Sequence, residues 1–162
     1  GGIPLAATCT TPEIEQDCHD KGFLHLTSHV SDPLPAEVGI AVLDVIAEES
    51  LNERAVELGG HLKAGLDAIQ QRHEVIGDVR GLGMLYGVEL VKDRHSREPD
   101  PERGAAITRR CMDLGLSMNI VSVGGMAAVW RIAPPLTATE GEIDQGLDIL
   151  DTAIGDVVAG RA

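Results

Sequence analysis

The sequence predicts a fold of the α/β class, built as an α+β layer in which an antiparallel sheet of three or four strands carries helices on one side. Apolar residues recur at helical spacing in four segments, a pattern typical of amphipathic helices. Residues 75–91 are predicted to be extended, and 118–123 and 128–133 to be two short strands joined at Gly124-Gly125, a hairpin signal. The expected order is therefore helices, an extended run, a helix, two strands and a helix.

Two helix starts are expected in the first fifty residues. Thr11 and Pro12 begin a short helix, with threonine as the cap and proline at the first helical position. Asp32 and Pro33 begin the next, because Asp is a favoured N-cap and the missing N–H of proline has no partner at that position. The apolar positions of this second helix are Val38, Val42, Val45 and Ile46.

The third helix is predicted to open with a capping box, Ser50-Leu51-Asn52-Glu53. Three glycines, Gly59, Gly60 and Gly65, weaken it by about 1 kcal/mol each relative to Ala. Close packing against a neighbouring element is one explanation for them. The apolar stripe of the helix is Leu51, Ala55, Leu58, Leu62, Leu66 and Ile69.

The later elements follow from similar signals. Most residues of 84–91 are apolar, and Glu89 is the strong outward marker. Gly81-Leu82-Gly83 does not fit a dinucleotide loop, because a strand and not a helix follows it. A helix over 102–114 ends at Gly115, and its buried stripe is Ala106, Ile107, Cys111 and Leu114.

The last helix is predicted from a second capping box, Thr139-Glu140-Gly141-Glu142. One face of this helix is apolar along its whole length, with Ile143, Leu147, Leu150, Ile154 and Val157. This face and the stripe of the third helix are the expected source of the core.

Composition excludes some partners. The formal net charge is −13, from 26 acidic and 13 basic residues, which opposes binding to a nucleic-acid backbone. No run of about 18 apolar residues exists, so no membrane partner is expected. Cys9, Cys18 and Cys111 fit no metal spacing, and reduced thiols in a cytoplasmic protein are expected. The chain begins without a methionine, so it is expected to be a fragment.

The polar loop before the second helix is the first candidate site. Within 27–32 it carries three hydroxyls, a histidine and a carboxylate, directly before a helix N-terminus. Hydroxyls in that place can meet an anion or a cation. The alternative is that Thr27, Ser28 and Ser31 are loop polar groups and Asp32 is only a cap, and spacing alone favours this alternative.

Arg131 is the second candidate, in an expected strand with apolar neighbours on both faces. A buried arginine is costly unless it is paired. Two roles stay open on sequence alone. One is a structural ion pair with Glu89 or another carboxylate, and the other is bidentate binding of a substrate carboxylate.

Five segments, in order along nearly the whole chain, resemble the class III aminotransferase family of pyridoxal-phosphate (PLP) enzymes of fold type I, and within it the 2,2-dialkylglycine decarboxylase branch. General members have a Gly-Gly-Asn-Pro type sequence where this chain has Val30-Ser31-Asp32-Pro33, which favours the decarboxylase branch. The segments are Ser28-His29-Val30-Ser31-Asp32-Pro33-Leu34-Pro35, Gly77-Asp78-Val79-Arg80-Gly81, Gly87-Val88-Glu89-Leu90-Val91-Lys92-Asp93, Gly115-Leu116-Ser117-Met118-Asn119-Ile120-Val121 and Arg131-Ile132-Ala133-Pro134-Pro135-Leu136-Thr137.

The resemblance implies site roles and a domain division. Arg131 would bind the substrate α-carboxylate, and Ser28, with Thr27 beside it, would contact the cofactor phosphate of a partner subunit. An alkali cation, potassium or sodium, would be held by Ser28, Val30 and Asp32, since oxygen ligands suit a hard cation. Residues 1–34 would be the tail of the large domain and 35–162 the C-terminal small domain.

Three readings of function follow. The first is the C-terminal part of a decarboxylating transaminase, a homodimer or dimer of dimers, that converts a dialkylglycine and passes the amino group to a 2-oxo acid such as pyruvate. The second is an ordinary class III aminotransferase. The third is a non-catalytic fragment or binding module, because the Schiff-base lysine of the family is missing and the chain alone is expected to be inactive.

Overall fold

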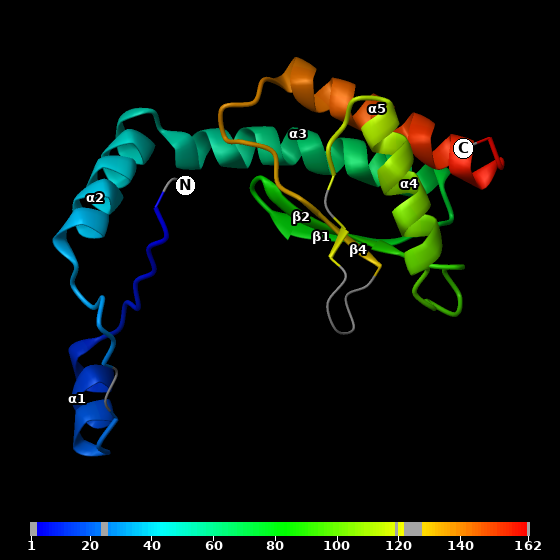
Figure 1. Cartoon of the computed structure of the whole chain (residues 1–162). Coiled ribbons are helices and arrows are strands. Elements are labelled where there is room, and N and C mark those ends of the chain that lie inside the picture. The colour runs from blue at the N-terminus through cyan, green and yellow to red at the C-terminus, as the bar shows by residue number, and fades with distance from the viewer. Residues whose placement is uncertain (1–2, 24–25, 119, 122–127, 162) are drawn as a thin grey trace. The chain divides into compact units, whose positions relative to one another are not determined.

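A four-stranded antiparallel sheet organises the second half of the chain (Figure 1). Its strands are β1 (Ile76–Leu82), β2 (Leu85–Leu90), β3 (Ile120–Val121) and β4 (Val129–Ile132), in the spatial order β1-β2-β4-β3. The predicted antiparallel sheet of three or four strands is therefore confirmed. The structure is a computed structural model that describes residues 3–23, 26–118, 120–121 and 128–161, and the expected turn at Gly124-Gly125 lies outside them.

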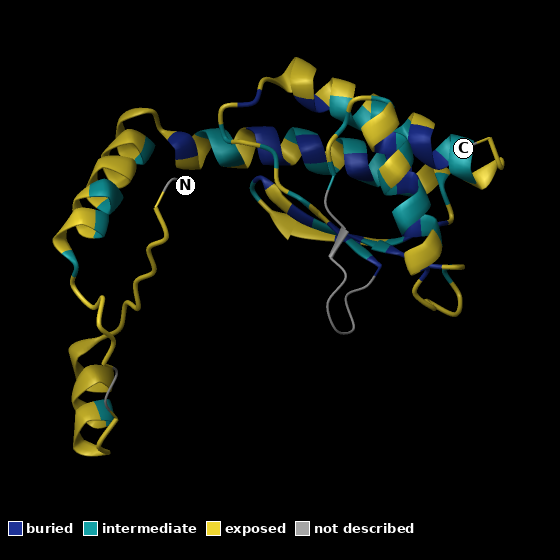
Figure 2. Ribbon diagram, in the orientation of Figure 1, coloured by how far each residue is buried: buried dark blue, intermediate teal, exposed yellow. Residues whose placement is uncertain are grey.

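Helices cover one face of this sheet (Figure 2). They are α3 (Leu51–Arg72), α4 (Pro101–Asp113) and α5 (Glu140–Val158). Val79, Val88 and Trp130 lie side by side across β1, β2 and β4 and are buried against the helices. Their chain neighbours point to the other face, since side chains alternate along a strand. The expected arrangement of helices on one side is confirmed.

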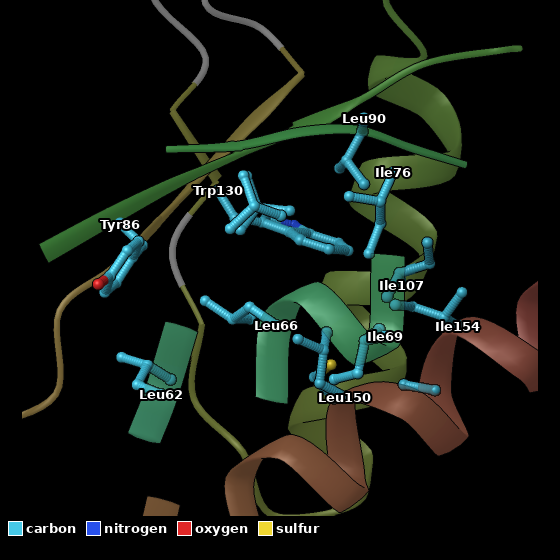
Figure 3. Close-up of a cluster of buried hydrophobic side chains, with 14 of the residues drawn as sticks. Leu62, Leu66, Ile69, Ile76, Tyr86, Leu90, Ile107, Trp130, Leu150 and Ile154 are labelled. Atoms are coloured by element: carbon cyan, nitrogen blue, oxygen red, sulfur yellow. The ribbon is translucent and has the colours of Figure 1, made fainter. Parts of the chain in front are cut away.

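The core is aliphatic with two aromatic anchors (Figure 3). Trp130 is fully buried, and its indole N–H donates to the Thr108 hydroxyl on α4 at 3.0 Å. The Tyr86 hydroxyl donates to the Gly59 carbonyl on α3 at 3.1 Å. Both polar atoms of the aromatic residues are thus satisfied inside the core, as buried donors require. Burial also raises the pKa of the Cys111 thiol to about 11, so this cysteine is a core residue rather than a reactive one.

Two of the three glycines in α3 allow close packing. A Cβ on Gly59 would overlap the backbone of Gly83, in the turn between β1 and β2, and one on Gly65 would overlap the Leu147 side chain of α5. Packing therefore explains these two positions. Gly60 has open space around it, so packing does not explain it.

Of the two predicted capping boxes, the one at Thr139 is confirmed and the one at Ser50 is wrong. Thr139 and Glu142 form the full capping box of α5, and the Asp100 carboxylate caps α4 by accepting from the Arg103 N–H at 3.1 Å. The capping box expected at Ser50 is wrong. The φ of Ser50 is 50°, in the left-handed region, whereas a capping residue needs an extended backbone.

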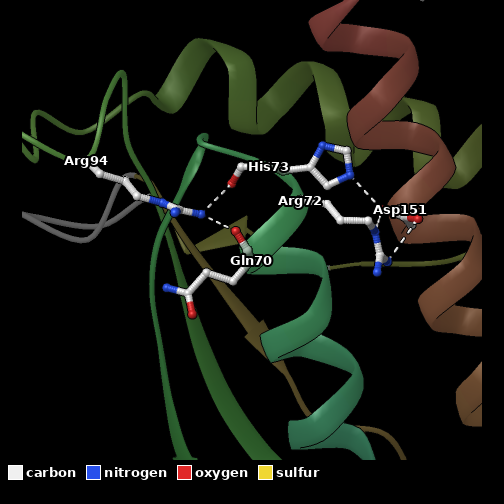
Figure 4. A network of polar contacts seen from close by, with 5 residues as sticks. All are labelled: Gln70, Arg72, His73, Arg94 and Asp151. Carbon is white, nitrogen blue, oxygen red and sulfur yellow. Dashed lines mark hydrogen bonds and ion pairs between the residues drawn. The ribbon is translucent and has the colours of Figure 1, made fainter.

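A polar network fixes the C-terminal end of α3 (Figure 4). The Arg94 guanidinium donates to the carbonyls of Gln70 and His73, which the helix leaves without intrahelical partners. Asp151 of α5 accepts from Arg72 and lies 2.6 Å from Nε2 of His73. These contacts tie α3 both to the loop after β2 and to α5.

The first fifty residues form a separate unit, Gly1–Ser50, apart from Leu51–Ala162. It contains α1 (Pro12–Asp20), capped by Thr11 as predicted, and α2 (Pro33–Glu48). Neither helix has a buried residue. The assignment of 1–34 to a large domain and 35–162 to a small one stays a prediction. Of the helices in the described ranges, none is long and apolar enough to cross a membrane.

The adjacent glycines of α3 give a matched test of packing. We expect Gly59→Ala to lower the free energy of unfolding by about 3 kcal/mol, because its Cβ meets rigid backbone. Gly60→Ala should raise it by about 0.5–1 kcal/mol through helix propensity alone. Urea denaturation followed by circular dichroism measures both. Equal effects of the two changes would contradict the packing of α3 against the β1–β2 turn.

Candidate functional site

Arg131 lies on the face of the sheet that the helices leave open. It follows the buried Trp130 in β4 and is exposed. Its neighbours are apolar on both faces, as expected, but Arg131 itself is not buried, because α3, α4 and α5 cover a single face. Period-two alternation then places Trp130 in the core and Arg131 outside it.

The sheet register gathers charged residues around Arg131. Arg80, Gly87 and Arg131 are aligned across β1, β2 and β4. Asp78 and Glu89 are aligned in the next row, and Val129 completes that row. Since side chains two residues apart share a face, all of these positions belong to the open face.

The carboxylates of this face are bound to Arg80. Its guanidinium lies 2.8 Å from Asp78 and 2.6 Å from Glu89. Hydrogen bonds to Asp78 and then to Glu89 raise the pKa of Arg80. Within the described parts of the chain, Arg131 makes no ion pair and no side-chain hydrogen bond. The structural ion pair between Arg131 and Glu89 is therefore not formed.

A cavity of about 890 Å³ extends from the end of β4 to α3 and α5, and Arg131 is among its lining residues. The rest of the lining is mainly apolar. Its polar members besides Arg131 are Ser117, Thr137, Thr108, which accepts from the Trp130 indole, and Glu142, which belongs to the α5 capping box. Among the described lining residues Arg131 is the only one with a cationic group, but the alternation along β4 directs its side chain to the opposite, open face, away from α3 and α5.

The polar loop before α2 belongs to the first unit and is considered by itself. Thr27 and Ser28 are exposed, and Ser31 has a φ of 64°. Asp32 is the N-cap residue of α2 by position but makes no capping hydrogen bond, which corrects its predicted role. Its carboxylate instead lies 2.7 Å from Nδ1 of His29, the exposed histidine beside it.

The loop could hold an ion only through a few oxygens. In the ranges that the structure describes, no three His, Cys, Asp or Glu side chains form a metal-binding group. Hydroxyl and carbonyl oxygens lie outside that test, so the Ser28, Val30 and Asp32 ligand set stays a prediction. It is a set of hard oxygen donors, the kind that alkali cations prefer.

The three lysines of the chain lie in ion pairs. Lys21 binds Asp17 at 2.7 Å and Lys63 binds Asp67 at 2.6 Å, each one helical turn apart. Lys92 pairs with Glu98 in the loop after β2. The hydrogen bond with Glu98 raises the pKa of Lys92.

Comparison with known proteins identifies the family. The family model described as "Aminotransferase class-III" matches residues 1–154. This chain belongs to the class-III aminotransferase family. The resemblance inferred from the sequence is thus confirmed for the family.

Relatives and solved structures agree with this family. An uncharacterized aminotransferase of Schizosaccharomyces pombe is 42% identical, over 94% of this chain and 34% of its own. A leucine/methionine racemase of Thermococcus litoralis is 35% identical, over 99% of this chain and 35% of its own. A Bacillus anthracis aminotransferase structure has a TM-score of 0.73 at 30% identity, and the match covers 82% of this chain and 30% of that one. The chain spans about a third of the length of the curated relatives it matches.

The sequence analysis did not identify the charged cluster of Asp78, Arg80 and Glu89. The spacing of Asp78 and Arg80 does place them on one face of a strand. The sequence does not show the register between β1 and β2, which places Glu89 beside Arg80. Register depends on the turn at Gly83 and on which face is buried, both of which are tertiary features.

The two N-cap positions, Asp32 and Thr139, allow a direct comparison. We expect Thr139→Ala to lower the free energy of unfolding by about 1 kcal/mol, because it removes a formed capping box. Asp32→Ala should cost well under that, since no capping bond is lost. Helix content measured during urea denaturation reports both. A loss for Asp32→Ala as large as that for Thr139→Ala would show that its carboxylate does cap α2.

Proposed function

We propose that the complete enzyme containing this chain is a PLP-dependent aminotransferase in which Arg131 binds the carboxylate of an amino acid or 2-oxo acid. The observation that carries this proposal is the free guanidinium on the open face, beside carboxylates that are committed to Arg80. The structural alternative required a pair such as Arg131 with Glu89, and Glu89 is bound to Arg80 instead. Family membership supports the reaction class.

The chemistry of Arg131 suits this role. Its planar fork can donate two parallel hydrogen bonds to one carboxylate, which fixes the orientation of the substrate as well as its position. A hydrogen bond to a charged group contributes about 1.5–3 kcal/mol.

The residues of this chain could supply only part of a PLP-binding site. When bound, PLP supplies an electron sink for the electrons left on the substrate when a bond to its α-carbon breaks. The exposed hydroxyls of Thr27 and Ser28, before the N-terminus of α2, suit a phosphate contact in a partner subunit of a homodimer or dimer of dimers. No lysine is placed for attachment, so we propose that this chain alone is inactive.

Replacing Arg131 by lysine in the full-length enzyme tests the proposal. The change keeps the charge but loses the fork. We expect kcat/KM for L-alanine to fall about ten- to a hundredfold in the first half-reaction, without added 2-oxo acid. The value for isopropylamine, which has no carboxylate, should change little. The melting temperature should stay constant, because Arg131 has no internal partner among the described residues.

The opposite result is equally clear. If Arg131 were structural, the variant would melt at a lower temperature and lose activity toward both amines alike. A variant that keeps full preference for L-alanine would also contradict the assignment.

A finer proposal is that the enzyme decarboxylates a 2,2-dialkylglycine before it transfers the amino group to a 2-oxo acid such as pyruvate. Its support is the sequence of 28–35 and of 117–121, with the oxygen donors of Ser28, Val30 and Asp32 for an alkali cation. An ordinary aminotransferase is the alternative. The racemase among the relatives shows that this family includes a protein named for a different reaction.

Release of carbon dioxide from 2-methylalanine, measured in potassium and in sodium buffers, tests the finer proposal. We expect release in the full-length enzyme, and a dependence on the cation that Asp32→Ala abolishes. Asp32→Ala removes no capping hydrogen bond, so a loss of activity would not result from unfolding of α2. Transamination of L-alanine without any carbon dioxide from 2-methylalanine would support the ordinary aminotransferase. An unchanged cation dependence in Asp32→Ala would remove Asp32 from the ligand set.

A further inference from the structure

Glu89 is related in the same way to two arginines. Gly87 of β2 pairs with Arg80 of β1 on one side and with Arg131 of β4 on the other. Glu89 lies two residues further along β2, so it is the diagonal neighbour of both arginines on the open face. Diagonal neighbours in an antiparallel sheet are about 7–8 Å apart, which long side chains can span. The register alone would let Glu89 bind either arginine.

In the structure, Glu89 binds Arg80 and not Arg131. The Glu89 carboxylate lies 2.6 Å from the Arg80 guanidinium and is not paired with Arg131. The difference between the two sides is the residue directly opposite Glu89. On β1 it is Asp78, which also binds Arg80 at 2.8 Å, and on β4 it is Val129, which has no charge. Among the described residues, Arg80 is therefore held by two acids and Arg131 by none.

Nothing in the sheet prevents Glu89 from turning to Arg131. The residue between the two arginines is Gly87, which has no side chain to separate them. A Cβ there would meet only Val129 Cγ1 at 3.7 Å and the Arg80 carbonyl at 3.8 Å. Glu89 is also partly exposed, so it keeps rotamer freedom. Without Arg80, two carboxylates of this face would remain and Arg131 would be their nearest cation.

We propose that Arg80 is a positioning residue that holds Glu89 away from Arg131 and so keeps Arg131 open for a substrate carboxylate. This inference rests on the proposed function of Arg131. In this account Arg80 never touches the substrate. It acts by removing an internal competitor that has the same chemistry as the substrate carboxylate.

The test uses the full-length enzyme and the first half-reaction with two donors, L-alanine and isopropylamine. Arg80→Gln frees Glu89, so we expect KM for L-alanine to rise about three- to tenfold, the effect of one competing contact at a half-exposed site. KM for isopropylamine and kcat for both donors should stay within about twofold. The double variant Arg80→Gln/Glu89→Gln removes the competitor and should restore KM for L-alanine.

Two further variants control the result. Lys92→Gln removes the same charge from an exposed ion pair with Glu98, away from this face, and should change neither KM. Arg80→Lys keeps a cation beside Asp78 and Glu89, so it should stay near the wild-type value and gives a folded comparison if Arg80→Gln is unstable. The melting temperature of each variant shows whether the fold has been affected.

The outcomes separate this inference from the function on which it rests. If Arg131→Gln leaves KM for L-alanine unchanged, the proposed function of Arg131 fails. If Arg131→Gln raises that KM but Arg80→Gln does not, only the role of Arg80 fails. A rise that the double variant does not reverse, or an equal rise for isopropylamine, would also overturn it, because a purely structural role predicts both.

Discussion

Coverage of the sheet on one face is the constraint on which the fold and the site both depend. Because α3, α4 and α5 bury a single face, the alternation along β4 separates two neighbouring residues into different environments. Trp130 enters the core and donates to Thr108, while Arg131 stands on the open face. A register shift of one residue would exchange them and would bury an unpaired guanidinium, at a cost far above that of a lost surface contact. The packing of Trp130 in the core therefore fixes the position of Arg131 on the open face.

The open face contains both a free cation and acids that could neutralise it. Asp78 and Glu89 share Arg80, and Val129 occupies the matching position beside Arg131. The local charge is therefore arranged so that one arginine is satisfied within the domain and the other is not. Surface ion pairs of this kind add little to stability, about 0–1 kcal/mol each. In the proposed role of Arg80, these ion pairs matter because they determine which arginine remains available to a substrate carboxylate.

The sequence predicted the features that have local causes. The stripes of α3 and α5, the capping box at Thr139 and the antiparallel sheet follow from spacing and from end residues, and the structure confirms them. The errors concern features with tertiary causes. Ser50 has the right neighbours for a cap but a left-handed backbone, and Asp32 binds His29 instead of capping. Arg131 was considered as a buried arginine because the sequence does not show that one face of the sheet stays open. The Arg80 cluster depends on register and could not be read from spacing.

A crystal structure of the full-length enzyme with a carboxylate-bearing inhibitor tests the central claim most directly, since it locates all the partners of Arg131 at once. The account predicts the inhibitor carboxylate within hydrogen-bonding distance of the Arg131 guanidinium, with Glu89 still bound to Arg80. A carboxylate bound elsewhere, with Arg131 paired to Glu89 or to another acid of the protein, would contradict it.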